Sequence, residues 1–123
     1  MKSYTDLEQS KKLAEILPLE SADMSWVSNG LGKPFARTIP IKGDPEELCG
    51  CWSLASLLEQ FPYELCDDYG NSAYLGINKE DDVYQLEYTD PYGDFKSIET
   101  DRYEHFVDAC VAMIEKLNEL KML

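Results

Sequence analysis

The most apolar run of the chain, against which both flanking segments are expected to pack, is Cys51-Trp52-Ser53-Leu54-Ala55-Ser56-Leu57-Leu58-Glu59-Gln60-Phe61-Pro62. Wound as a helix, this run has little polar surface, and a helix that is apolar on most sides is buried. Pro62 ends it, because proline lacks a backbone amide. Just before it, Asp44-Pro45-Glu46-Glu47 has the signals of a helix start, interrupted by Gly50. We therefore predict a short helical turn and then a buried central helix that begins near Ser53.

The segment before the central run predicts a helix followed by a hairpin. Thr5-Asp6-Leu7-Glu8 has the spacing of a capping box, and the apolar residues after it recur at helical intervals until Pro18. Residues 24–27 and 35–41 favour strands, and the Asn29-Gly30 pair between them favours a turn.

The segment after the central run predicts a second hairpin and a long final helix. Residues 73–78 and 83–88 flank the polar sequence Lys79-Glu80-Asp81-Asp82. Alternation along the second run directs one set of side chains to a common face, namely Tyr84, Leu86 and Tyr88. Residues 95–99 favour one further short strand. Residues 101–120 open on a capping pattern and then carry an apolar face at intervals of three and four residues.

The predicted order is helix, hairpin, helix, hairpin, helix. Hairpins separated by helices, without the regular spacing of βαβ units, indicate an antiparallel sheet. We therefore predict an α+β fold in which two β-hairpins form one small antiparallel sheet packed against about three helices. A chain of 123 residues has the size of one domain, so residues 1–123 are expected to form a single compact domain.

Acidity is the most unusual bulk property of the chain. Twenty-four acidic residues against eleven basic ones give a net charge of −13, and residues 59–108 hold fourteen acids and three bases. Attraction to nucleic-acid phosphates or to an anionic membrane depends on clustered Lys and Arg, so direct binding to either is not expected. A basic protein partner, mimicry of nucleic-acid charge, and solubility alone are the interpretations that remain.

The N-terminal sequence and the hydropathy bear on cellular location. Residues 1–8 lack the apolar core of a secretory signal, and no run approaches the roughly 20 apolar residues that span a bilayer. We therefore expect a cytoplasmic protein in which the four cysteines are reduced thiols.

Cys49-Gly50-Cys51-Trp52 resembles the nucleophile region of papain-like cysteine peptidases, in which Cys-Gly-x-Cys-Trp places the second cysteine at a helix N-terminus. This sequence is one residue shorter than that spacing. The resemblance implies that Cys51 is a nucleophile, with a thiolate favoured by the helix N-terminus, and that His105, the only histidine, is its base. A small thiol-dependent hydrolase is therefore the alternative function. In the simpler interpretation, Cys51 and Trp52 are core residues.

Other patterns for catalysis or metal binding are weak. Cys49 and Cys51 form a C-x-C pair, whereas structural zinc sites use pairs spaced C-x₂₋₄-C, and Cys66, Cys110 and His105 are single residues. The acidic turns at 67–71 and 90–94 lack the ligand spacing of an EF-hand. The sequence has no Gly-rich phosphate loop and no G-x-S-x-G. We therefore predict a non-enzymatic protein without a cofactor or a metal site.

The acidic second hairpin and its loops are the strongest interaction candidate. Tyrosines are interleaved with acids there, and tyrosine supplies contact area at interfaces for little conformational entropy. The predicted binding surface consists of Asp67, Asp68, Tyr69, Tyr84, Tyr88, Tyr92 and Asp94. In the simpler interpretation, the strand tyrosines cover the sheet and the acids are solvated.

Residues 13–24, 51–58 and 108–114 resemble a group of small uncharacterised acidic proteins from gut bacteria and their phages or mobile elements. The resemblance implies a compact domain of accessory genes, and it carries over no activity, cofactor or functional residue. The acidity, the single histidine and the tyrosine-bearing hairpin predict a non-enzymatic accessory protein that binds another protein. A basic partner and mimicry of nucleic-acid charge are sharper forms of this prediction.

Overall fold

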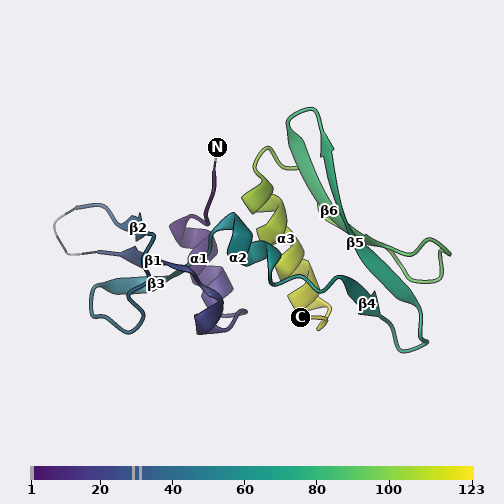
Figure 1. Cartoon of the computed structure of the whole chain (residues 1–123), viewed down its shortest axis with the longest axis horizontal. Coiled ribbons are helices and arrows are strands. Elements are labelled where there is room, and N and C mark those ends of the chain that lie inside the picture. The colour runs from purple at the N-terminus through teal and green to yellow at the C-terminus, as the bar shows by residue number, and fades with distance from the viewer. Residues whose placement is uncertain (1, 29, 31) are drawn as a thin grey trace.

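The computed structural model describes residues 2–28, 30 and 32–123. Within these residues, three α-helices form a layer between a three-stranded and a four-stranded antiparallel sheet (Figure 1). The elements follow in the order α1 (Leu7–Ala14), a 3-10 turn (Leu19–Ser21), β1 (Met24–Val27), β2 (Phe35–Arg37), β3 (Glu47–Cys51), α2 (Leu54–Leu58), β4 (Glu64–Cys66), β5 (Ser72–Glu80), β6 (Val83–Thr89), β7 (Ile98–Glu99) and α3 (Phe106–Glu119).

The first sheet has the strand order β2-β1-β3, and α1 packs against β3. The first predicted hairpin is confirmed, because β1 and β2 pair antiparallel with Trp26 opposite Ala36. The second strand is shorter than predicted and ends at Arg37. Pro40, which has no amide to donate, limits the pairing beyond it. Asn29, half of the predicted turn, lies outside the described residues.

The prediction of a helical turn at residues 44–50 was wrong. Residues 44–46 form a turn, and β3 follows it and pairs with β1, with Cys49 opposite Trp26. The central helix is confirmed but short, since α2 begins at Leu54 after Cys51 has ended β3. Ser53 caps it by accepting a hydrogen bond from the Ser56 amide.

The second sheet has the strand order β4-β5-β6-β7 and holds the second predicted hairpin. β5 and β6 are joined by Asp81-Asp82, with Glu80 opposite Val83. Only Ile98–Glu99 of the predicted strand at 95–99 forms, as β7. The α+β class is therefore confirmed, but the single small sheet is not. The two hairpins lie in separate sheets, because the helical layer has two faces and one hairpin covers each.

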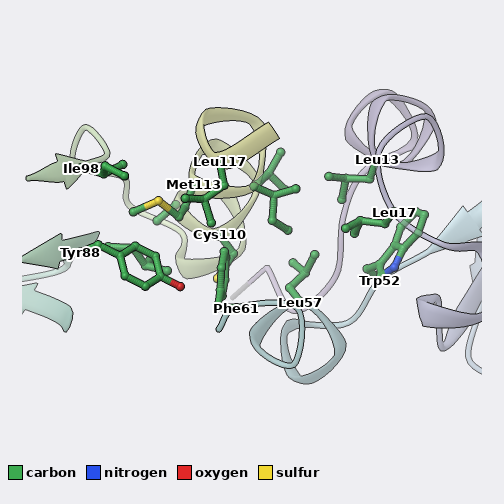
Figure 2. Close-up of a cluster of buried hydrophobic side chains, with 14 of the residues drawn as sticks. Leu13, Leu17, Trp52, Leu57, Phe61, Tyr88, Ile98, Cys110, Met113 and Leu117 are labelled. Atoms are coloured by element: carbon green, nitrogen blue, oxygen red, sulfur yellow. The ribbon is translucent and has the colours of Figure 1, made fainter. Parts of the chain in front are cut away.

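The core is a continuous cluster that links the second sheet to all three helices. Figure 2 shows Tyr88 and Ile98 on the sheet side, α3 beside them, and Leu57, Leu13 and Trp52 beyond α3. The predicted apolar face of the last helix is confirmed, since its buried residues are Val107, Ala109, Cys110, Val111, Met113, Ile114 and Leu117. The helix itself begins later than predicted, with His105 at the N-cap.

The chain start crosses the middle of the molecule. The predicted capping box is displaced by one residue, because Asp6 and Gln9 form it instead of Thr5 and Glu8. Thr5 is buried and its amide donates to the Trp52 carbonyl oxygen at 2.9 Å. The Lys2 ammonium donates to the Asp108 carboxylate at 2.7 Å, which ties this segment to the first turn of α3.

Candidate functional site

Five of the seven predicted surface residues lie at one end of the second sheet. The β4–β5 loop carries Asp67, Asp68 and Tyr69, and the β6–β7 loop carries Tyr92 and Asp94. β5 begins where β6 ends, so both loops leave the sheet at the same end, opposite the tip of the β5–β6 hairpin (Figure 1). We call residues 67–71 and 90–95 the loop end.

Tyr88 and Tyr84 do not belong to this surface. Tyr88 is fully buried, and its hydroxyl donates to the Pro62 carbonyl oxygen at 2.6 Å. Burial raises the pKa of Tyr88 to about 12. Tyr84 lies at the hairpin end of β6, where its ring stacks on Phe106 with the centroids 5.1 Å apart. Both were predicted as surface residues, but the alternation that groups them directs them toward α3.

The first loop is closed around the carboxylate of Asp67. This carboxylate accepts hydrogen bonds from the backbone amides of Tyr69 (2.8 Å) and Asn71 (2.9 Å) and from the Asn71 side chain (2.9 Å). The Asn71 side chain is the main group that lowers the pKa of Asp67. Gly70 follows with φ +82°, a left-handed conformation that glycine adopts without strain.

The second loop repeats this construction around Asp90. Its carboxylate accepts from the backbone amides of Tyr92 (2.8 Å), Asp94 (3.1 Å) and Phe95 (2.9 Å). Gly93 follows the tyrosine with φ +78°. The loops share the sequence Asp-x-Tyr-Gly followed by Asn or Asp, although each was predicted only as an acidic turn. Their common spacing was the available signal for a repeated structure.

Both loops present a tyrosine to solvent on a fixed backbone. Tyr69 is 91% exposed and Tyr92 is 88% exposed, the two most exposed large apolar side chains among the described residues. A loop that is already ordered loses less entropy on binding, so contacts made by its side chains contribute more to affinity.

A groove adjoins the loop end, between the C-terminal turn of α3 and the second sheet. One part has a volume of about 480 Å³ and an apolar lining that includes Phe95, Ile98, Leu120 and Met122. The other part has a volume of about 600 Å³ and runs along β4. Leu120, Met122 and Asp67 line both parts, so the two are continuous. No pattern in the sequence indicates this groove, since Leu120 continues the apolar spacing of the helix.

The structure gives Cys51 the opposite of a nucleophile's environment. Cys51 ends β3 instead of opening a helix, and it is fully buried. Burial raises the pKa of its thiol to about 11, which disfavours the thiolate. The Thr5 hydroxyl lies 3.8 Å from its sulfur, whereas His105 is exposed at the N-cap of α3. Neither residue lines the groove.

The four thiols are spread over the fold, and only Cys49 and Cys51 share an element, β3. Cys110 is buried on α3, Cys66 is exposed on β4, and Cys49 is half-buried on β3. In the described part of the chain, no three His, Cys, Asp or Glu side chains converge as metal ligands. These residues therefore provide no support for the zinc alternative.

No family model, no curated protein and no solved structure matches this chain. Among the described residues, no helix combines the length and the apolar sequence that crossing a bilayer requires.

Proposed function

We propose that this chain is a non-enzymatic accessory protein that binds a basic protein partner through the loop end of the second sheet. The observation that carries the proposal is the pair of loops with one construction, each holding an exposed tyrosine on a hydrogen-bonded backbone. Tyrosine is enriched in interfaces because it combines a large contact area with few rotatable bonds. The function is thus binding, with Tyr69 and Tyr92 as its anchors.

Charge supports a basic partner. Residues 59–108 have a net charge of −11, and ten of their fourteen acids are exposed. In the sequence, Asp68 directly precedes Tyr69, and Asp94 follows Tyr92 by two residues. Complementary charge speeds association and excludes acidic competitors more than it adds to affinity.

Mimicry of nucleic-acid charge is a narrower form of the proposal. It is supported by exposed acids at both ends of the second sheet, with Asp81 and Asp82 at the hairpin tip and Asp68 and Asp94 at the loop end. In this form the basic partner is itself a nucleic-acid-binding protein, and DNA competes with this chain for it. The origin in a phage or mobile element and the cytoplasmic location remain proposals that rest on the sequence alone.

The experiment is a pull-down with tagged protein from the lysate of its own host at low and high salt. The Tyr69→Ala/Tyr92→Ala variant should capture at least about tenfold less partner than the original protein, as expected when interface anchors are removed. The matched control is Phe35→Ala/Ile39→Ala, which removes two exposed apolar side chains on β2 and just after it and should leave capture unchanged. Equal capture by the tyrosine variant and the original protein would overturn the proposal.

Salt and DNA then separate the forms of the proposal. Capture of a basic protein that weakens at high salt supports the role of charge, because salt screens exposed pairs. Loss of the captured partner on adding duplex DNA supports mimicry of nucleic acid. A partner whose capture survives both high salt and duplex DNA would indicate that binding depends on Tyr69 and Tyr92 and not on charge.

A further inference from the structure

β4 is an edge strand with one open side. The strand order places β4 first in the second sheet, and in the residues that the structure describes it pairs with β5 alone. An edge strand with unpaired backbone groups is a template for adding another strand. The wider part of the groove runs along β4 toward the end of α3.

Alternate residues along this segment bond to the β5 side. The Tyr63 carbonyl oxygen accepts from the Leu75 amide at 3.1 Å, and the Asp67 amide donates to the Asn71 carbonyl oxygen at 2.9 Å. In an antiparallel pair of strands, successive residues direct their backbone N–H and C=O groups alternately toward the paired strand and away from it. Leu65, midway between Tyr63 and Asp67 and opposite Ala73, therefore also bonds to β5.

Glu64 and Cys66 thus direct their backbone groups to the open side of the sheet. In the described part of the chain, neither residue makes a backbone hydrogen bond to a turn, a loop or a helix. A segment of another protein laid along β4 would find two amides and two carbonyl groups available for bonding.

Along β4, three apolar side chains form the floor of the groove within a largely polar lining. Leu65 is buried, Met122 is half-buried, and Leu120 is 51% exposed at the end of α3. The volume of about 600 Å³ lies within the range of about 300–1,000 Å³ that is typical of ligand sites. Alternate side chains of an added strand would point into this floor, because side chains along a strand alternate between faces.

The rim of the groove is acidic along β4. Among the described residues, the part along β4 is lined by Glu64, Asp67 and Asp68 with Lys121, and the other part by Glu99 and Glu119 with Lys96 and Lys116. An added strand would place its outward side chains beside the Glu64 carboxylate, which lies 3.4 Å from the Cys66 sulfur on the outer face of β4. Basic side chains complement this rim, and acidic ones are repelled by it.

We propose that this groove binds an extended segment of the partner in which basic residues alternate with apolar ones, added to the edge of β4 as a further strand. The inference rests on the proposed function and names the part of the partner that is recognised. Backbone hydrogen bonds to Glu64 and Cys66 supply the pairing, Leu120 and Met122 contact the apolar side chains, and the acidic rim selects the basic ones.

Hydrogen exchange at individual amides tests this inference directly. The probe is an acetylated heptapeptide of alternating lysine and valine, titrated into the intact protein and followed by NMR. At saturation the amides of Glu64 and Cys66 should gain at least about tenfold protection, while the Leu65 amide, which already bonds to β5, should change little. The same peptide N-methylated at alternate residues, and a glutamate–valine peptide, should both fail to protect them.

Three variants extend the test. Leu120→Lys should weaken binding of the lysine–valine peptide at least about tenfold, because it places a charge in the apolar floor. The matched control is Ile77→Lys, whose side chain is similarly exposed (48%) on β5 away from the groove and should change affinity less than about twofold. Lys121→Gly should strengthen binding by removing the opposing charge.

The outcomes separate this inference from the proposed function. Unchanged exchange at Glu64 and Cys66 with saturating peptide would overturn the inference. Capture of a basic partner that depends on Tyr69 and Tyr92 but not on Leu120 would also overturn it, while the proposed function would stand. If the tyrosine variant captures normally and the peptide protects β4, the loop end is rejected and the groove is retained.

Discussion

The hydroxyl of Tyr88 on β6 donates a hydrogen bond of 2.6 Å to the carbonyl oxygen of Pro62, which precedes β4. Both groups lie beneath the second sheet, where Tyr88 is fully buried. The bond satisfies the one polar atom of the Tyr88 ring and fixes the segment that leads from α2 into β4. Because Pro62 also lines the groove, this contact links the core to the proposed binding edge.

Replacing Tyr88 by phenylalanine should lower the free energy of unfolding by about 1 kcal/mol, because the half-buried Pro62 carbonyl group loses its hydrogen-bond donor. Urea unfolding followed by circular dichroism measures the change. Tyr92→Phe, at an 88% exposed position, is the control and should have no measurable effect. Equal stability of the two variants would show that the buried bond contributes nothing.

Stability should fall as pH rises above 9. Burial raises the pKa of Cys51 from 9.0 to about 11 and that of Cys110 from 9.0 to about 12. The unfolded chain therefore releases protons near pH 9 that the folded protein still holds, and this difference favours unfolding as pH rises. The stabilisation is complete below pH 9 and is lost as pH rises toward 11–12.

Unfolding free energies measured at intervals from pH 8 to pH 11 check this expectation. Cys110→Ala should flatten the decline, whereas Cys66→Ala, at an exposed thiol, should leave its slope unchanged. A flat profile for the original protein would contradict the expected linkage.

Gly50 is required for close packing of β3 against the chain before β1. A Cβ atom added at Gly50 would lie 2.8 Å from the Cβ of Ala22, and both positions are buried. Gly50→Ala should therefore cost about 1–3 kcal/mol. Adding Ala22→Gly should recover part of the loss, with a coupling free energy of about 1 kcal/mol in a double-mutant cycle. Strictly additive effects would show that the cost of Gly50→Ala does not come from a clash with Ala22.

Asp90 should control the order of the second tyrosine loop. Asp90→Ala removes the acceptor of three backbone amides, so the NMR order parameter of the Tyr92 amide should fall from about 0.85 to below about 0.6. Asp94→Ala is the control, because Asp94 contributes its backbone amide to this network. An ordered loop in the Asp90 variant would mean that the carboxylate does not hold it.

Lys121 adopts a left-handed backbone with φ +58° directly after α3. Glycine adopts this conformation without the steric cost that a Cβ atom imposes there, so Lys121→Gly should raise the unfolding free energy by about 0.5–1 kcal/mol. Thermal unfolding measures the change, with Lys116→Gly inside the helix expected to lower stability. A destabilised Lys121 variant would show that its side chain contributes more than the strain costs.

The elements that the sequence predicted well depend on local patterns. The β5–β6 hairpin follows from alternation on either side of a polar turn, and α3 follows from apolar residues at helical spacing. β3 was missed because Asp44-Pro45 resembles a helix start, whereas its strand conformation depends on distant pairing with β1. The number of sheets was missed for the same reason, since no local pattern states which hairpins share a sheet.

The sequence indicated most of the residues of the candidate site, but not how they are arranged in space. Tyr69 and Tyr92 were in the predicted surface, but only the register of β5 with β6 brings their loops to one end. Tyr88 was misplaced because alternation groups side chains on one face without telling which face a helix will cover. The groove depends on where α3 ends over the sheet, a relation between segments far apart in the chain.

The repeated loop has a consequence for how affinity depends on its parts. A partner surface that spans this end of the sheet can contact both Tyr69 and Tyr92, because both loops leave the sheet there. The second contact then forms at a high effective concentration, without a second loss of translational freedom. Removing either tyrosine should convert a bivalent attachment into a monovalent one, so most of the affinity should disappear with the first substitution and little more with the second.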